Sequence, residues 1–499
     1  MSQSAPSLDE QALRRVVEDV LAKLGQTPSA PAASTPSPAA EPKDCGCHKR
    51  SSGGGRHFGV FTEVSAAAEA ATGAYRQLTA KGVSARARVI EIVKTLCVAN
   101  AESWGKIELD ETKIGRLDHK IEKLQIIKHV PGVEWLRPDA LSGDHGITLE
   151  EFAPFGVIGA ILPVTHSVPT LSGNIVNMVA AGNAIIFNPH PGGARCAALA
   201  VKTYNEAIYR ELGIENLICT IEQPSLDTFN ALCAAPEVNL LVVTGGPGVV
   251  NAAMKSGKRA ICAGPGNPPV VVDESADLAK AARNIITGAA YDNNLLCIGE
   301  KAVFVVDKVY TAFLRELDQA GASKLDARQL ERLTKAVFDF KGEGGGCSHA
   351  VLKRDLVGKD PAVLAREAGA TLAHAKSPLL YAETAADHLF VIEEQMMPML
   401  PVVRVRDFQE GVQAALVAEH GYCHSAIIHT RNVDQMTYMG REMGTTLYVK
   451  NGPCTAGLGL GGEGYLSYSI ATTTGEGITN PRTFTRTRRC VMVDNLRIF

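Results

Sequence analysis

Residues 156–187 read GVIGAILPVTHSVPTLSGNIVNMVAAGNAIIF, and this stretch decides the fold. Gly156–Leu162 is a near-continuous apolar run typical of a buried strand, and the residues that follow, up to Ala181, have the length and pattern of a helix. Ala184–Phe187 reads as a second buried strand. Two apolar strands joined by a helix indicate a βαβ unit with parallel strands.

The same alternation continues along the chain. A helix is predicted at Ala194–Leu212, and further strands are predicted at Leu217–Ile221, Leu240–Val243 and Ala260–Cys262, with helices between them. Buried strands alternating with helices predict an α/β fold with a parallel, doubly wound sheet. Because such sheets bind ligands outside the carboxyl ends of their strands, the functional site is expected there.

Polar and glycine-rich segments follow these strands, namely Pro163–His166, Asn188–Pro191, Thr244–Gly248 and Gly264–Asn267. Gly245-Gly246 opens a predicted helix, whose free N–H groups are suited to a pyrophosphate. Glycine-rich turns between a strand and a helix are also common for geometric reasons alone. The sequence GxGxxG followed by an acidic residue about 20 positions later is missing, so no dinucleotide fingerprint is present.

Cys297 is the candidate nucleophile. It lies in YDNNLLCIGEK (residues 291–301), between a predicted helix at Leu278–Ala290 and a predicted strand at Ala302–Val306. This places the thiol on a turn from helix to strand, where it can meet a substrate. Several other cysteines fall within predicted helices or strands, where free cysteine acts as a small hydrophobic residue: Cys97, Cys196, Cys219, Cys233 and Cys262.

Composition narrows the class of protein. A chain of 499 residues with 45% hydrophobic and 21% charged residues describes a soluble globular protein of two or three domains. A net charge of -3 provides no basic surface for nucleic acid, and no apolar run is long enough for a membrane span. The start of the chain does not have the pattern of a secretory signal. The 12 cysteines are not spaced as a disulfide framework, which favours a reducing cytosol.

Residues 1–24 are predicted to form an amphipathic helix, and residues 25–56, rich in Pro, Ala, Ser and Gly, a flexible linker. The apolar stripe can pack back on the same chain or dock on a partner, and the long linker favours docking. Cys45-Gly46-Cys47-His48 lacks the further ligands of a zinc site, so no metal is predicted. The apolar stripe consists of Leu13, Val16, Val17, Val20, Leu21 and Leu24.

From about residue 57 to the end, the chain resembles the aldehyde dehydrogenase superfamily. Within it, the chain is most similar to the CoA-acylating aldehyde dehydrogenases of bacterial microcompartments, of the propionaldehyde or acetaldehyde type. The resemblance is carried, in order, by Thr244–Gly246, Gly264–Glu274, Asp292–Asn294 with Cys297, Glu393–Val403, Val449–Pro453, Gly459–Gly464 and Thr474–Gly477.

The resemblance implies an aldehyde dehydrogenase-like fold of three parts. A Rossmann-type nucleotide-binding domain is expected at residues 57–131 and 153–265, and an α/β catalytic domain at 266–465. Residues 132–152 and 480–499, which alternate apolar and polar side chains over much of their length, are expected to form a small β arm for oligomerisation. The protein is therefore expected to be a homo-oligomer.

The resemblance assigns Cys297 as the nucleophile that attacks the aldehyde. Hydride transfer to NAD would then leave an acyl thioester on its sulfur. The oxyanion needs hydrogen-bond donors, and the Cys297 backbone N–H is one candidate. The superfamily's second donor is an Asn side chain, but here His166 stands at that position. His166 either donates in its place or is a structural loop residue.

A general base is also missing from its usual position. Hydrolytic members of the superfamily carry a Glu 34 positions before the nucleophile, and here that residue is Ala263. Without this carboxylate, water is not activated, so coenzyme A is the expected acceptor of the acyl group. The alternative is a hydrolytic enzyme that makes a carboxylate with its base elsewhere, in which Ala263 only packs.

The resemblance further places NAD against one group of residues. Glu394 is expected to hold the nicotinamide ribose, and Asn188 and Pro189 the adenosine half. His424 and His429 are expected in the core, outside catalysis. The remaining cofactor-binding candidates are Thr165, His190, Thr244, Gly245, Gly246 and Gly264.

The expected substrate is a short aliphatic aldehyde, with propanal ahead of acetaldehyde. The resemblance also implies that the helix at residues 1–24 docks on shell or cargo proteins and places the enzyme in a cytoplasmic microcompartment. An alternative of another class is a structural cargo or assembly protein whose active site is no longer used. Only His166 favours it, whereas Cys297, Glu394 and Gly245-Gly246 speak against it.

Overall fold

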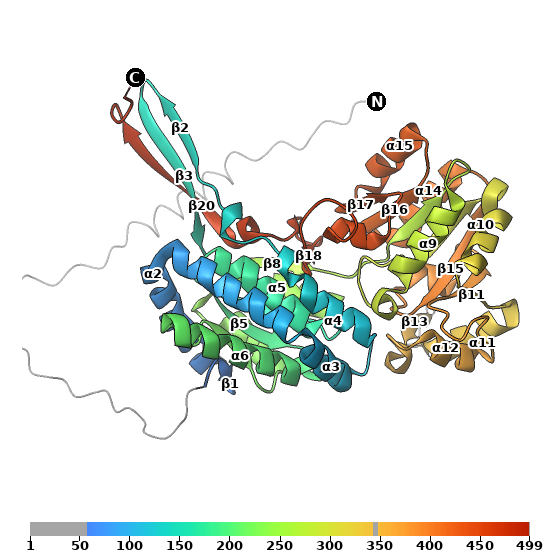
Figure 1. Cartoon of the computed structure of the whole chain (residues 1–499), viewed down its shortest axis with the longest axis horizontal. Coiled ribbons are helices and arrows are strands. Elements are labelled where there is room, and N and C mark those ends of the chain that lie inside the picture. Colours follow the sequence, from blue (N-terminus) through green and yellow to red (C-terminus); the bar gives the residue numbers. More distant parts are fainter. Residues whose placement is uncertain (1–56, 343–347, 499) are drawn as a thin grey trace, which may run out of the picture. The chain divides into compact units, whose positions relative to one another are not determined.

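The computed structural model describes residues 57–342 and 348–498 (Figure 1). The predicted amphipathic helix, the linker and Cys45–His48 lie outside the described residues. No helix within the described part has the length and apolar content needed to cross a membrane.

The first sheet has six parallel strands, which confirms the predicted doubly wound sheet. All six residues of its central strand β4 are buried, as are all residues of the following helix α5, so both faces of β4 are covered. In spatial order the strands are β1 (Val60–Phe61), β6 (Ile218–Ile221), β5 (Ala184–Pro189), β4 (Val157–Leu162), β7 (Val238–Thr244) and β8 (Ala260–Ala263).

The chain order of these strands reverses beside β4. From β4 the chain steps through β5 to β6 on one side, and then returns to β7 and β8 on the other. The carboxyl ends of β4 and β7 therefore flank a switch point, where parallel sheets form a crevice. The helices of this region are α2 (Val64–Ala99), α3 (Ala101–Thr112), α4 (Leu117–Gln125), α5 (Ser167–Ala180), α6 (Ala194–Leu212), α7 (Leu226–Ala234) and α8 (Pro247–Lys255).

A second parallel sheet lies in the following part of the chain and has seven strands. Its strands, in spatial order, are β11 (Ser323–Lys324), β14 (Leu380–Thr384), β15 (Met399–Val405), β10 (Ala302–Val306), β9 (Pro269–Val272), β16 (Ser425–His429) and β17 (Leu447–Lys450). Its helices are α9 (Leu278–Ala289), α10 (Asp307–Gln319), α11 (Ala327–Val337), α12 (Pro361–Ala368), α13 (Leu389–Ile392), α14 (Phe408–Glu419) and α15 (Val433–Met443).

A three-stranded antiparallel arm joins two distant segments (Figure 1). The hairpin β2 (Asp139–Gly143) and β3 (Gly146–Pro154) pairs with β20 (Thr485–Val493) near the chain end. The outer strands are exposed along almost their whole length, with Leu141 65% exposed. The role of this arm in a homo-oligomer stays a prediction, as does the division into domains near residues 131, 153 and 265.

Short elements complete the described chain. Two small antiparallel hairpins are β12 (Phe338–Gly342) with β13 (Ser348–Leu352), and β18 (Ile470–Ala471) with β19 (Gly477–Ile478). The 3₁₀ turns are η1 (Ile126–His129), η2 (Val133–Trp135), η3 (Pro191–Gly193), η4 (Tyr291–Asn294), η5 (Arg354–Leu356), η6 (Cys454–Leu458) and η7 (Pro481–Phe484).

Candidate active site

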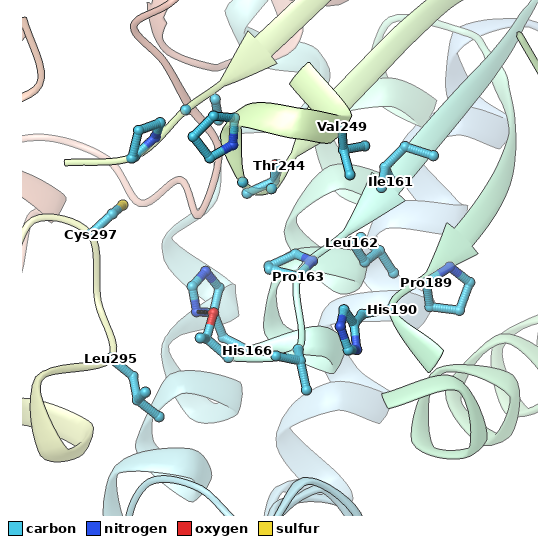
Figure 2. A pocket seen from close by; sticks show the side chains of 18 of the residues that line it. Ile161, Leu162, Pro163, His166, Pro189, His190, Thr244, Val249, Leu295 and Cys297 are labelled. Carbon is cyan, nitrogen blue, oxygen red and sulfur yellow. Dashed lines mark hydrogen bonds between the residues drawn. The ribbon is translucent and has the colours of Figure 1, made fainter. Parts of the chain in front are cut away.

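A cavity of about 620 Å³ lies at the carboxyl edge of the first sheet (Figure 2). Segments that precede β10 and β15 of the second sheet form the facing wall. All the residues predicted from the sequence line this one cavity: Thr165, His166, Asn188, Pro189, His190, Thr244, Gly245, Gly246, Gly264, Cys297 and Glu394. The predicted residues from Thr165 to Gly264 meet there because the strands of the first parallel sheet end at a common edge, whereas Cys297 and Glu394 come from the segments before β10 and β15.

Cys297 lies on the predicted turn, between η4 and β10, and is half-buried in the cavity wall. Burial and, to a smaller extent, the nearby Glu394 carboxylate raise the pKa of its thiol to about 12. The Lys301 ammonium and the backbone N–H groups of Cys297 and Ile298 act in the opposite direction. The thiol is therefore protonated at neutral pH in the ligand-free cavity.

The other cysteines that were expected to be structural differ from Cys297 in their surroundings. None of them lines the cavity. Cys97, Cys196, Cys219 and Cys262 are buried, and Cys233 is half-buried.

Lys301 and Glu300 are charged residues that lie wholly in the protein interior just after the thiol. The Lys301 Nζ donates to the Asn294 carbonyl oxygen at 2.8 Å, and burial lowers the pKa of Lys301. Burial raises the pKa of Glu300 to about 7, and its Oε1 accepts the Cys454 N–H at 2.8 Å. This burial could not be predicted from the sequence, because a Glu-Lys pair beside a strand is usual at a protein surface.

His166 stands at the amino end of α5 with 5% of its surface exposed. Its Nδ1 is 2.8 Å from Thr165 Oγ1. Burial, together with the charge of Lys123, lowers the pKa of His166 to about 3. The imidazole is therefore neutral over the physiological range and can donate one hydrogen bond into the cavity or to Thr165.

Ala263 ends β8, lines the cavity and is 6% exposed. A methyl group thus occupies the position where hydrolytic members of the superfamily carry their base. Glu394 is the one carboxylate among the residues that line the cavity, and burial raises its pKa. No carboxylate therefore stands at the position of Ala263 to take a proton from water.

The turn after β7 is shaped to receive a nucleotide. Gly246 is the N-cap of α8 and provides no side chain to its N–H groups, and a Cβ at Gly246 would meet no atom within 4 Å. A phosphate can therefore approach the backbone closely at the positive end of this helix. Leu226, Phe229 and Val249 supply apolar walls beside this turn, as a planar base requires.

Several residues of the cavity wall were not predicted from the sequence, among them Arg354, Tyr468 and Ile470. Arg354 of η5 is the one Lys or Arg side chain among the lining residues, and Tyr468 and Ile470 come from near the chain end. None of these three residues follows a strand of the first sheet, so their position in the cavity could not be predicted from the strand ends. His424 and His429, expected in the core, are both buried and do not line the cavity.

Comparisons with known proteins show the family of the chain. The model of the aldehyde dehydrogenase family matches residues 59–336. The chain is 42% identical over 446 residues to the acetaldehyde dehydrogenase (acetylating) EutE of Salmonella typhimurium, covering 88% of this chain and 94% of that protein.

Two solved structures have the same fold. The propionaldehyde dehydrogenase of Rhodopseudomonas palustris, with bound CoA and an acylated cysteine, gives a TM-score of 0.84 at 40% identity, covering 89% of this chain and 100% of that one. The propionaldehyde dehydrogenase of the Clostridium phytofermentans fucose utilisation bacterial microcompartment gives a TM-score of 0.85 at 40% identity, covering 88% and 100%.

The similarity extends over nearly the whole described chain and includes both parallel sheets and the arm, so the fold and the resemblance predicted from the sequence are confirmed. This chain belongs to the aldehyde dehydrogenase family, and within it to the CoA-acylating enzymes.

Proposed function

We propose that the protein oxidises a short aliphatic aldehyde, propanal ahead of acetaldehyde, to its acyl-CoA through a thioester on Cys297. The observation that carries this proposal is one cavity lined by the Cys297 thiol, by the glycine turn before α8 and by Ala263, which stands where hydrolytic relatives carry a base. Relatives named for acetylating and propionaldehyde activity support the substrate class. The cavity walls suit a nucleotide, as Gly246 and the apolar residues beside α8 indicate.

In this reaction the Cys297 sulfur bonds to the aldehyde carbon and gives a thiohemiacetal. The Cys297 backbone N–H and the neutral His166 imidazole hydrogen-bond the oxygen. NAD bound in the cavity would supply the hydride acceptor, and loss of the hydride and of the hydroxyl proton would convert the thiohemiacetal into the thioester. The thiol of coenzyme A then bonds to the carbonyl carbon, the Cys297 sulfur leaves, and the product is acyl-CoA.

The other lining residues serve the nucleotide. Glu394 binds the nicotinamide ribose hydroxyls, while Asn188, Pro189 and His190 contact the adenosine half. The turn Thr244–Gly246 contacts the pyrophosphate with the Gly246 N–H as donor, because the Gly245 N–H already donates to the Ala263 carbonyl oxygen at 3.3 Å. Thr165 and Gly264 complete the wall near the nicotinamide. All of these residues line the same cavity, which supports the assignment.

Replacing Ala263 tests the choice between CoA and water. We expect Ala263→Glu to release free carboxylate in the absence of CoA at a rate at least tenfold above that of the unmodified enzyme, because a carboxylate would activate water. Ala263→Gln has the same shape without the base and is the matched control. Products are measured by chromatography with and without CoA. Free acid as the main product of the unmodified enzyme in the presence of CoA would favour the hydrolytic alternative.

The raised pKa of the thiol predicts how its reactivity depends on pH. Only the thiolate reacts with iodoacetamide, and its fraction increases about tenfold per pH unit below the pKa. With a pKa of about 12, the alkylation rate of Cys297 in the ligand-free enzyme should rise from pH 7 to 10 without a plateau. Glu394→Gln removes a charge that raises this pKa, so alkylation at pH 9 should be faster than in the unmodified enzyme.

Mass spectrometry of Cys297 measures the rate, and the exposed Cys423 serves as an internal reference. A plateau near pH 8, or slower alkylation in the Gln variant, would contradict the assignment of the charges around the thiol.

Arg354 is expected to bind a phosphate of coenzyme A. It is exposed at the cavity wall, and no carboxylate of the described residues pairs with it. Coenzyme A carries a ribose phosphate that NAD lacks, so Arg354→Ala should raise KM for CoA about tenfold, more than KM for NAD, with kcat little changed. Arg366→Ala, on α12 outside the cavity, is the control. An equal effect of both variants on KM would exclude this role.

We also propose that residues 1–24 dock on a shell or cargo protein and place the enzyme in a microcompartment of the cytoplasm. The amphipathic pattern of this segment and a relative from a microcompartment support the proposal. Deleting residues 1–24 should leave kcat and KM unchanged but abolish co-purification with purified compartments. A deletion variant that still co-purifies would show that another surface directs the enzyme.

A further inference from the structure

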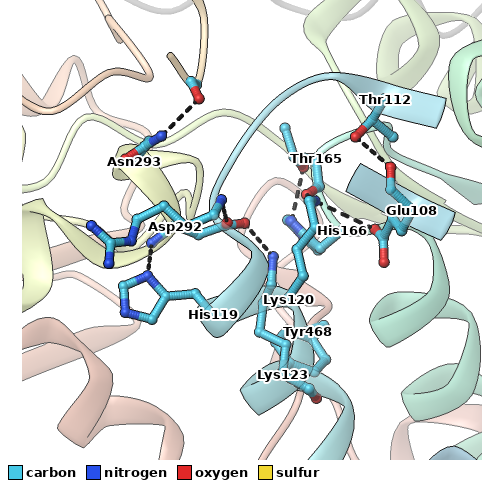
Figure 3. Close-up of polar contacts among 12 residues, drawn as sticks. Glu108, Thr112, His119, Lys120, Lys123, Thr165, His166, Asp292, Asn293 and Tyr468 are labelled. Carbon is cyan, nitrogen blue, oxygen red and sulfur yellow. Dashed lines mark hydrogen bonds and ion pairs between the residues drawn. The ribbon is translucent and has the colours of Figure 1, made fainter. Parts of the chain in front are cut away.

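A group of buried charged side chains includes Asp292, which lies in the turn shortly before Cys297 in the chain (Figure 3). Glu108 of α3, Lys120 and Lys123 of α4, and Asp292 of η4 have no exposed surface. Lys123 Nζ is 2.5 Å from Asp292 Oδ2, and Lys120 Nζ is 3.8 Å from Glu108 Oε1. None of the four lines the cavity, and the proposed reaction gives none of them a role.

Asp292 begins a run of unusual backbone conformation. Asp292, Asn293 and Asn294 have φ angles of 48°, 55° and 63°, in the left-handed region that residues with a Cβ rarely adopt. Three such residues in succession persist only where surrounding contacts hold them. Two residues separate this turn from Cys297, so a change in the turn moves the thiol.

The contacts that hold Asp292 come from α4 and from the two residues just before it. Its Oδ2 accepts from Lys123, and its Oδ1 accepts the Arg116 N–H at 2.7 Å. Its own N–H donates to His119 Nδ1 at 2.8 Å. A Cβ on Gly115 would lie 2.3 Å from Asp292 Oδ1, so the carboxylate sits directly against this backbone.

The carboxylate is ionised in this setting. Burial acts to raise the pKa of Asp292, but the charges of Lys123 and Lys120 and the hydrogen bonds from Lys123 and Arg116 hold it below its ordinary value. A buried charge without its partner is strongly unfavourable, so the pair keeps α4 and the turn together.

Lys120 holds the opposite wall of the reaction centre. It lies one turn before Lys123 on the same face of α4, and its Nζ is 3.4 Å from the carbonyl oxygen of Thr165. Thr165 and His166 form the loop that faces Cys297 across the cavity. One face of a nine-residue helix thus contacts both the turn before the thiol and the loop of the proposed oxyanion donor.

We propose that Asp292 is a positioning residue, which with Lys123 holds the left-handed turn so that Cys297 faces the Thr165-His166 loop. Lys120 holds this loop at a fixed place relative to the same helix. The inference rests on the proposed function, because it takes Cys297 as the nucleophile.

Asp292→Asn and Lys123→Met test the pair. Asn keeps the shape of Asp and can still accept from Arg116, but it removes the charge that binds Lys123. We expect kcat to fall about 100-fold in each variant, because a displacement of about 1 Å at a reacting atom has an effect of this order. KM for aldehyde and for NAD should stay within about threefold, since neither residue lines the cavity. The rates are measured well below the unfolding temperature of each variant.

The double variant Lys123→Met/Asp292→Asn separates positioning from simple destabilisation. It contains no unpaired charge at this place, so its melting temperature should exceed that of either single variant, while kcat stays low. Recovery of kcat in the double variant would overturn the proposal, because the loss would then come from the unpaired charge alone.

Asp273→Asn is the matched control for removing a buried carboxylate. Asp273 has no exposed surface, accepts the Ser275 N–H at 2.8 Å and does not line the cavity. Its variant should lose stability but keep kcat within about threefold. A loss of kcat as large as in Asp292→Asn would contradict the proposal, and so would full kcat in Asp292→Asn.

Cys297→Ala tests the proposed function separately. Aldehyde oxidation that persists in this variant would contradict the nucleophile itself, and the inference about Asp292 would fail with it. If Cys297→Ala is inactive while Asp292→Asn has full kcat, only the inference about Asp292 is wrong.

Discussion

The site depends on charged side chains that are buried beside the cavity and removed from water, above all Lys123, Asp292 and Lys301. Removing an ion from water costs several kcal/mol even after the protein relaxes, so a buried lysine needs a partner at short range. Lys123 finds it in Asp292, and Lys301 in the oxygens of Asn294. Both partners belong to the turn whose residues Asp292–Asn294 have left-handed backbone conformations. The same dry surroundings keep the Cys297 thiol protonated until ligands change its environment.

Much of the fold was predictable because buried strands and helices have recognisable apolar patterns in the sequence. The apolar runs at Gly156–Leu162 and Ala184–Phe187 became β4 and β5, and the helix at Ala194–Leu212 has the predicted bounds. Strand ends were less certain: β7 begins at Val238, two residues before the apolar run, because pairing with β4 extends it. The lining residues from the first sheet followed from its strand ends, since the topology of a parallel sheet gathers them at one edge.

The rest of the site depends on contacts that the sequence does not display. The α4 sequence LDHKIEKLQ reads as a polar surface helix, and Lys123 is 169 positions from the carboxylate that allows its burial. Arg354 reaches the cavity from a 3₁₀ turn that has no apolar pattern. Ala263 could be identified without the structure. It stands 34 positions before Cys297, where hydrolytic members of the superfamily carry a Glu, and the absence of that carboxylate is visible in the sequence.

The pairing of β20 with β3 also bears on how the chain is made. The first sheet is complete once residue 263 has been synthesised, but the outer edge of β3 has no neighbour until Thr485–Val493 leaves the ribosome. During translation of more than 300 intervening residues, this hairpin presents an open strand edge, the kind of surface on which nascent chains associate. Protection of this edge by a chaperone or by rapid completion of the chain is therefore a condition for producing the folded enzyme.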